Sequence, residues 1–208
     1  MKKVYLSNDD IIDCINFANY TVSQHYKRMW QNENDGILKI ILGKLGELSI
    51  SKYCEMIGIK TKTNFRIDTG IDTADLIIHK KNIAVKSKNF KRMMLPPLSN
   101  IWLHIPIDQY PKIIEHNTVT VIAVCLHSNN NQVKEWAMTP FCTTNIIGGL
   151  LIGEYDKLKI LHRAGEEISP GFRLPPPNSW AVPWSELYDF DILLHKIKQC
   201  QLPYPFKG

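Results

Sequence analysis

The residues whose types could do chemistry lie close together in the first half of this sequence. Glu47 follows two nearby glycines, Asp75 opens an apolar run, and Lys86 lies in the next run. Hydrolysis of a phosphodiester needs one or two Mg²⁺ ions, which hold the phosphate and activate the attacking water. Mg²⁺ binds carboxylate oxygens, and a lysine stabilises the developing negative charge. Residues of these types could together support metal-dependent cleavage of a phosphodiester.

The alternation of side chains along a strand decides which of these groups can meet. In the segment 82–87, position 84 shares a face with Lys86, and the intervening residues occupy the other face. Asp75 begins the preceding strand, so a hairpin would bring it beside the face that carries Lys86. A carboxylate that opens a buried strand is costly unless it binds a metal or pairs with another group. The glycines at 43 and 46 would let a helix bearing Glu47 approach the sheet closely.

Helices and strands must position these residues. Ser7 and Asp10 match a capping box and predict a helix that runs to about residue 25. The polar stretch 31–36 is expected to end that unit, and a second helix is expected over 37–57, followed by Gly58. Strands are predicted at 64–67, 74–79, 82–87, 118–127, 134–139 and 158–162, a Pro-rich surface segment at 169–184, and a closing helix over 190–199 with Asp189 as its N-cap.

The order of these elements predicts an α/β fold with a central mixed β-sheet flanked by helices. The 208 residues are expected to form one domain, with a motif core at about 37–90 and a C-terminal extension at about 140–208. The N-terminus lacks the apolar core of a signal peptide, and we expect no membrane span. The five cysteines are scattered and odd in number, which indicates free thiols and a cytoplasmic location.

The motif residues resemble the PD-(D/E)XK nuclease superfamily, which includes many type II restriction endonucleases. The helix motif G-x-x-G-E of that family is matched by Gly43, Gly46 and Glu47. Its strand that opens with an aspartate and continues apolar is matched by 75–78, and its hydrophobic–acid–hydrophobic–lysine strand by 83–86. The resemblance implies a restriction-endonuclease-like core with a catalytic site at Glu47, Asp75, position 84 and Lys86, in which Asp75 and Glu47 are the metal ligands. It also implies double-stranded DNA as the substrate and Mg²⁺ as the cofactor, for which Mn²⁺ can substitute.

Ala84 departs from the family pattern, because it stands where the family has Asp or Glu. Alanine cannot bind a metal, so the chain is expected to cleave poorly or not at all. Shifting the frame to 86–88 places a lysine at the acid position and does not restore the motif. Two interpretations stay open: a DNA endonuclease in which alanine has replaced the acid, and a naturally inactive nuclease-fold protein that binds nucleic acid or a protein. An isolated alanine among intact motif residues favours the first.

Each motif residue also has an ordinary structural interpretation. Most helical glutamates are solvated, which would apply to Glu47, and Lys86 could be an exposed strand lysine. Asp75 could be a turn residue, with Asp72 as the real ligand. Considered singly, each of these interpretations is favoured. The joint occurrence of Glu47, Asp75 and Lys86 in the order of the family motifs favours the nuclease site.

The formal net charge is +5, and basic residues gather between Lys80 and Arg92. A solvated hairpin is one interpretation of this cluster, and contact with nucleic acid phosphates is the other. Its place beside the predicted site favours phosphate contact, and we assign Lys44, Lys88, Lys91 and Arg92 to nucleic acid binding. Symmetric cleavage of a duplex is most simply done by two related subunits, so we expect a homodimer.

Overall fold

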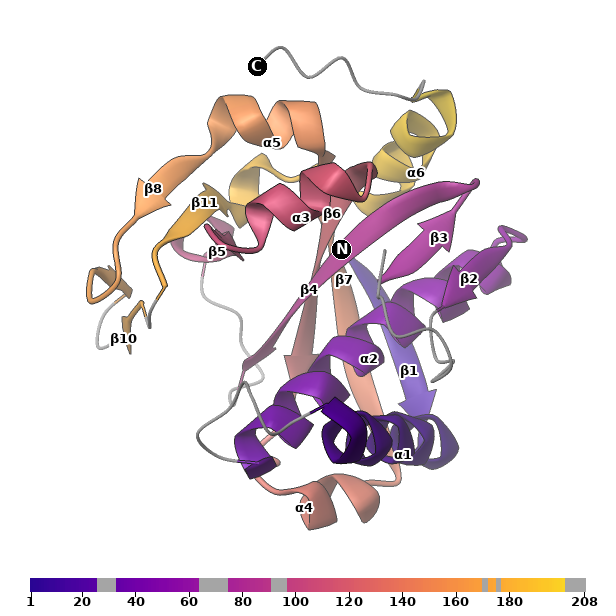
Figure 1. The fold of residues 1–208 in the computed structure, drawn as a ribbon. Coiled ribbons are helices and arrows are strands. Elements are labelled where there is room, and N and C mark those ends of the chain that lie inside the picture. The colour runs from indigo at the N-terminus through magenta and orange to yellow at the C-terminus, as the bar shows by residue number, and fades with distance from the viewer. Residues whose placement is uncertain (26–32, 64–74, 91–96, 170–171, 175–176, 201–208) are drawn as a thin grey trace.

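A six-stranded mixed β-sheet runs through the centre of the protein, with helices around it (Figure 1). The computed structural model describes residues 1–25, 33–63, 75–90, 97–169, 172–174 and 177–200. In spatial order the strands are β1 (Lys2–Ser7), β7 (Phe141–Leu151), β6 (Thr118–His127), β4 (Lys81–Phe90), β3 (Leu76–Ile78) and β2 (Thr61–Thr63). Neighbouring strands are antiparallel, except that β4 and β6 are parallel. The predicted fold class is confirmed.

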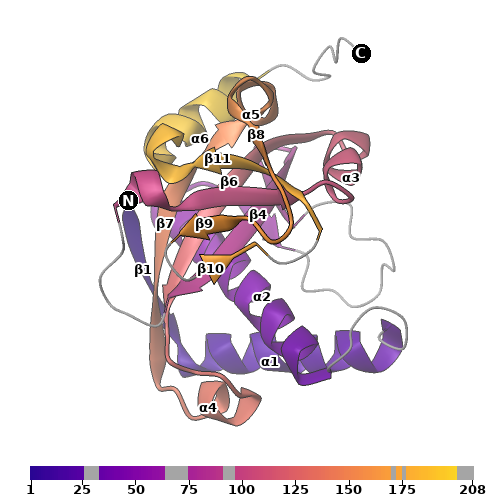
Figure 2. The same cartoon turned by 90° about the vertical axis from the view of Figure 1, so that its left-hand side faces the viewer.

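Two small sheets and the helices complete the described part of the chain. One small sheet contains β5 (Trp102–Pro106), β11 (Ser179–Pro183) and β8 (Ile160–His162), and the other pairs β9 (Glu167–Ser169) with β10 (Phe172–Arg173). The helices are α1 (Asn8–His25), α2 (Glu33–Met56), α3 (Tyr110–Glu115), α4 (Val133–Ala137), α5 (Ile152–Leu158) and α6 (Phe190–Gln199), with 3-10 turns at Leu98–Asn100 and Trp184–Glu186. Figure 2 shows α4 at one end of the long strands and α5 and α6 at the other.

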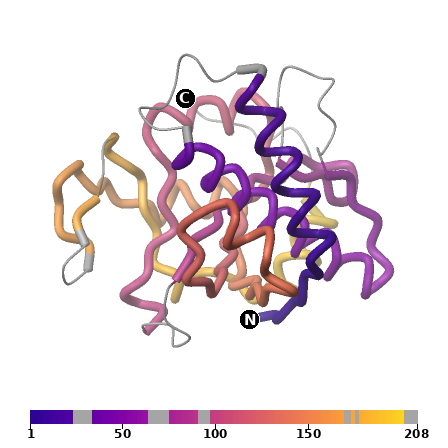
Figure 3. The backbone as a smooth tube through the Cα atoms, turned by 90° about the horizontal axis from the view of Figure 1, so that it is seen from below, coloured from indigo at the N-terminus to yellow at the C-terminus, as the bar shows by residue number. Residues whose placement is uncertain are grey.

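The large sheet separates two apolar cores, and this separation determines which face of β4 a residue occupies. The first core contains the buried faces of α1 and α2 together with Ile83 and Val85. The second contains Ala84 and the apolar residues of β5 and β11. Successive side chains of a strand point to opposite faces, which explains the alternation. In Figure 3 the three-stranded sheet and α1 lie on opposite sides of the molecule. Strand β6 is buried on both faces, as its continuous apolar run predicts.

The N-terminal helix forms as its sequence predicts. The backbone N–H of Ser7 donates to Asp10 Oδ2 at 2.7 Å, and the backbone N–H of Asp10 lies 3.3 Å from Ser7 Oγ. These two bonds satisfy donors that the first helical turn leaves open. The apolar positions of the predicted face are all buried: Ile11, Ile15, Ala18 and Val22. Lys52 of α2 pairs with Asp10 at 2.5 Å and joins the two helices.

The boundaries of α2 are partly as predicted. Its start is earlier, because residues 33–36 form the first turn instead of ending the preceding unit. Polar residues are compatible with an exposed first turn, and an acid there interacts favourably with the helix dipole. Its end is as predicted, since Gly58 follows the helix with a φ of 77°. The closing helix α6 is also confirmed, with the Asp189 side chain accepting from the N–H of Asp191.

Other predicted elements need correction. The prediction of a strand at 134–139 is wrong, because this segment contains α4. The helix starts where the N–H of Gln132 donates to Glu135 Oε2 at 2.9 Å, and it buries Trp136. Part of the Pro-rich segment also differs from the prediction, since 179–183 form the middle strand of the small sheet. The strand expected at 158–162 is shortened by α5. The one expected at 64–67 lies outside the described residues.

Two general predictions concern cysteines and membranes. All five cysteines lie in described parts of the chain, and no disulfide joins them. Burial raises the pKa of the Cys54 and Cys142 thiols to about 12, so both stay protonated at neutral pH. Among the described helices, none has the length and apolar character that crossing a membrane requires.

Candidate functional site

The β3–β4 hairpin places Asp75 beside Ala84. His79 and Lys80 form the turn with φ angles of 49° and 64°, the left-handed conformation that two-residue hairpin turns favour. In the resulting register Leu76 pairs with Ile83. One residue further along, Asp75 comes opposite Ala84. The sequence predicted that Asp75 would lie beside the face of residues 84 and 86, and the register agrees with this. The predicted connection at 80–81 was one residue late, because β4 already begins at Lys81.

The Asp75 carboxylate also has a structural role. Its Oδ2 accepts a hydrogen bond from the backbone N–H of Val85 at 2.7 Å. Strand β3 pairs with β4 only as far as Ile83, so Val85 lies beyond the ladder between these strands. The carboxylate takes the place of a strand partner at this position, which satisfies a backbone donor that would be costly to leave unpaired. The position of Asp75 at the opening of an apolar strand therefore has an explanation without a metal.

Ala84 and Lys86 share the face of β4 that is opposite to Val85. Ala84 is 7% exposed and packs in the second core. The Lys86 ammonium reaches the surface, where it donates to Gln109 Oε1 at 3.0 Å. Asp75, Ala84 and Lys86 therefore form one small constellation of strand positions where β3 begins. Alanine occupies the position between the carboxylate and the lysine.

Glu47 belongs to a different environment. It is 5% exposed and forms a buried ion pair with Lys44 at 2.8 Å. The Lys44 ammonium also lies 4.6 Å from the centroid of the Phe17 ring. Both side chains thus pack within the two-helix layer. A direct contact of Lys44 with nucleic acid, which the sequence predicted, would require this buried pair to open.

Helix α2 approaches β4 closely at one of the two motif glycines. A Cβ on Gly46 would lie 2.0 Å from Ser87 Oγ and 3.5 Å from Val85 Cγ1. A Cβ on Gly43 would meet nothing within 4 Å. The predicted close approach to the sheet is therefore confirmed for Gly46 and not for Gly43. It also shows that α2 covers the face opposite to Lys86.

The donor groups of the described residues do not fit a Mg²⁺ ion. No three histidine, cysteine or acidic residues among them gather closely enough to hold a metal. Glu47 pairs with Lys44, and an oxygen of Asp75 accepts from Val85. The side chain of Ala84 offers no oxygen. Asp72, the alternative ligand, lies outside the described residues.

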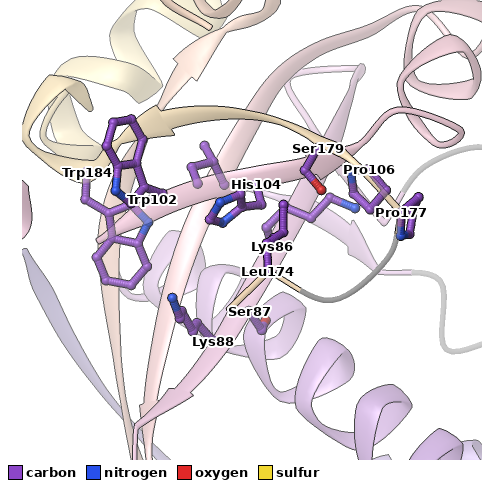
Figure 4. Close-up of a pocket in the computed structure, with 11 residues that line it drawn as sticks. Lys86, Ser87, Lys88, Trp102, His104, Pro106, Leu174, Pro177, Ser179 and Trp184 are labelled. Atoms are coloured by element: carbon purple, nitrogen blue, oxygen red, sulfur yellow. The ribbon is translucent and has the colours of Figure 1, made fainter. Parts of the chain in front are cut away.

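A pocket of about 290 Å³ opens between β4 and the three-stranded sheet (Figure 4). Lys86 and Lys88 line it from β4, and Trp102 and His104 line it from β5. Trp184 contributes a further wall. Both lysines were predicted from the sequence as site residues, and Trp102 and His104 were not, although alternation along the run WLHIP places these two on one face.

The charge of this pocket comes from its lysines. Burial, together with the nearby Lys88 and His162, lowers the pKa of His104 to about 4. His104 is therefore neutral at physiological pH, with its Nε2 at 3.1 Å from Nδ1 of His162. Burial also lowers the pKa of Lys88, whose ammonium lies 5.5 Å from the centroid of the Phe90 ring. A cation held in a partly desolvated pocket interacts more strongly with an anion than one in water.

The basic cluster between Lys80 and Arg92 does not form one surface. Lys81 is 9% exposed, and its ammonium donates to the backbone carbonyls at the end of α6, including that of Lys198 at 3.2 Å. It therefore caps a helix. Lys80 is exposed in the turn. Lys91 and Arg92 lie outside the described residues.

Comparison of the chain with models of protein families, with curated proteins and with solved structures finds no match.

Proposed function

We propose that this chain is a DNA-binding protein with the core of a PD-(D/E)XK nuclease, most similar to a type II restriction endonuclease, and that Ala84 leaves it without cleavage activity. The observation that carries the proposal is the constellation of Asp75, Ala84 and Lys86 at the edge of β4. Two residues of the motif occupy neighbouring strand positions on the appropriate faces. The residue between them is the one that lacks a metal-binding group.

The missing acid explains why the donor set does not fit a metal. An acid at 84 would stand opposite Asp75, and the Cβ atoms of such cross-strand neighbours lie about 5 Å apart. Two carboxylates at this separation could share one Mg²⁺, which would supply the Lewis acid and the activated water of hydrolysis. With alanine there, Lys86 can still bind a phosphate, and Asp75 retains its hydrogen bond from the Val85 N–H.

A naturally inactive binding protein is the second candidate, and two contacts favour it. Glu47 is already neutralised by Lys44, and Asp75 already satisfies the N–H of Val85. Both acids therefore have structural roles that do not need a metal. The natural gene distinguishes the candidates at codon 84: an acid there supports the endonuclease, and alanine supports the binding protein.

The partner in both cases is nucleic acid, and we propose double-stranded DNA. Lys86 and Lys88 present two ammonium groups at a concave surface whose described walls carry no carboxylate. We further propose that the protein acts in the cytoplasm as a homodimer, because paired sites cut both strands of a duplex most simply. Light scattering with and without DNA tests the dimer, and a monomer in both states would favour a nicking or structure-specific enzyme.

The experiment that tests DNA binding is a salt titration of affinity for a short duplex. Each neutralised phosphate releases counterions, so the affinity falls as salt is added. A plot of log affinity against log salt concentration should have a slope of about −0.9 for each phosphate contact. Changing Lys88, Lys91 and Arg92 together to alanine should weaken binding at least about tenfold at moderate salt. A matched control removes the same charge from exposed lysines elsewhere: Lys134, Lys157 and Lys198. Equal affinities of the two triple variants would show that the cluster is only a solvated face.

A further inference from the structure

We propose that the pocket between β4 and the three-stranded sheet binds a single unpaired nucleotide of a DNA strand, with its base against Trp102 and its phosphates at Lys86 and Lys88. The inference rests on the proposed DNA-binding function and adds to it the form of DNA that the site prefers. Its evidence is the composition of the pocket walls, the separation of the two lysines, and a buried donor in one wall.

The walls combine aromatic and apolar groups with positive charge. Trp102 and Leu103 come from β5, and Leu174 and Pro177 come from the segment before β11. Among the described lining residues none is acidic, and the formal charges are those of Lys86 and Lys88. An apolar cleft with a few polar groups is the usual form of a small-molecule site. A nucleotide matches this composition, because it has a flat aromatic base and anionic phosphates.

The two lysines serve opposite ends of the pocket. Figure 4 shows the ammonium of Lys88 on the side of Trp102 and Trp184, and that of Lys86 on the side of Pro106 and Pro177. The hydrogen bond from Lys86 to Gln109 agrees with this direction. A nucleotide within a strand has a phosphate on each side of its sugar. Cations at both ends therefore suit an internal nucleotide better than a free phosphate, which needs only one.

A buried donor in the wall gives a second indication of a ligand. Trp184 is 2% exposed, and its indole Nε1–H has no hydrogen-bond partner among the described residues. A buried N–H without an acceptor is costly. Carbonyl oxygens and ring nitrogens of a base are acceptors of the kind that this donor lacks. The neutral His104 adds a ring without adding charge.

The pocket requires the nucleotide to be unpaired. A base inside a duplex is stacked and paired, so a protein reaches it in a pocket only after the nucleotide leaves the stack. Unstacking costs least where the nucleotide is already without a partner. DNA with an unpaired nucleotide should therefore bind more tightly than a fully paired duplex of the same sequence.

The test compares a short duplex with the same duplex carrying one extra, bulged thymidine, by fluorescence anisotropy. Stacking of one base on an aromatic side chain should give at least about a fivefold preference for the bulged DNA. Trp102→Ala should remove the preference for bulged DNA, whereas Trp102→Phe should keep most of it. Trp180→Ala is the matched control, because Trp180 lies on β11 and packs against Lys159 at 4.8 Å, outside the pocket.

A second measurement separates this inference from the proposed function. Thymidine 5′-monophosphate should quench the tryptophan fluorescence of the protein, and deoxyribose 5-phosphate, which has no base, should not. Equal affinities for paired and bulged DNA without a response to the mononucleotide would overturn the pocket and leave duplex binding intact. A Trp102-dependent response to the mononucleotide without duplex binding would support the pocket and refute the proposed function.

Discussion

The carboxylate of Asp75 accepts a hydrogen bond from the backbone N–H of Val85 at 2.7 Å, just beyond the last paired residue of β3. This bond holds Asp75 against β4 at the level of Ala84. An acid introduced at 84 would therefore face a carboxylate that is already fixed in place. The predictions about cleavage follow from this relationship.

Replacing Ala84 by Asp or by Glu should produce Mg²⁺-dependent, EDTA-sensitive DNA cleavage, because the new carboxylate completes a pair with Asp75. Both acids should be tried, since their reach differs by one methylene.

Ala84 is 7% exposed, so an acid there is desolvated and should lower the melting temperature in the absence of metal. Mg²⁺ should restore the melting temperature of the variants and leave that of the parent protein unchanged. Ala84→Asn is the uncharged control. If neither acid cuts DNA with Mg²⁺ or Mn²⁺, the endonuclease interpretation is wrong.

Adding Lys86→Ala to the restored background should slow cleavage by about 100-fold or more, because a fixed cation stabilises charge that develops in the transition state. The affinity for DNA should fall by much less, since Lys86 is one of several phosphate contacts and its interaction acts mainly on the transition state. Single-turnover cleavage and anisotropy measure the two quantities separately. Lys80→Ala in the same background removes an exposed lysine from the hairpin turn and should leave both values unchanged. Equal losses of affinity and of cleavage rate would show that Lys86 acts only in binding.

Glu47→Ala should lower the free energy of unfolding by about 3–5 kcal/mol, because it leaves the Lys44 ammonium buried without that counter-charge. Urea denaturation measures this change. Glu55→Ala, at an exposed position of the same helix, is the control and should have little effect. Replacing both partners, Lys44→Met with Glu47→Leu, should recover much of the stability. A stable Glu47→Ala protein would argue against the structural role of this pair.

Gly46→Ala and Gly43→Ala should have opposite effects on stability although both glycines lie in α2. A Cβ at 46 would lie 2.0 Å from Ser87 Oγ, so Gly46→Ala should cost about 1–3 kcal/mol. At 43 nothing lies within 4 Å, so alanine should stabilise the helix by up to about 1 kcal/mol. Combining Gly46→Ala with Ser87→Ala should recover part of the loss, since the nearest clashing atom is then absent. Two variants of equal stability would contradict the close packing of α2 on β4.

The stability of the protein should fall as the pH decreases from about 6.5 to about 4, and His104 should contribute to this fall. Its pKa is lowered from 6.5 to about 4 in the folded protein. Between these values the unfolded chain binds a proton at this histidine and the folded protein does not, so acidification favours unfolding. His104→Gln should therefore make the pH dependence of the melting temperature less steep over this range. His195→Gln, at an exposed histidine, should leave the slope as it is.

Features set by neighbouring residues could be predicted from the sequence. The capping of α1 by Ser7 and Asp10, the end of α2 at Gly58 and the start of α6 at Asp189 all depend on groups within a few residues of each other. The faces of β4 follow from the alternation of side chains along a strand. A tight turn between β3 and β4 could also be predicted, although the expected connection at 80–81 would have set Asp75 opposite Lys86 instead of Ala84.

Features set by distant parts of the chain required the tertiary structure. The pocket joins β4 to a sheet whose strands β5, β8 and β11 come from separate regions of the sequence, and no local pattern specifies their pairing. The prediction of a strand at 134–139 was wrong because a short cap and the burial of Trp136 stabilise a helix there. Glu47 was predicted as a metal ligand from a motif that consists only of residues near it in the sequence. Its environment depends instead on the packing of α1 against α2, which buries Lys44 and Glu47 together and makes their pairing favourable.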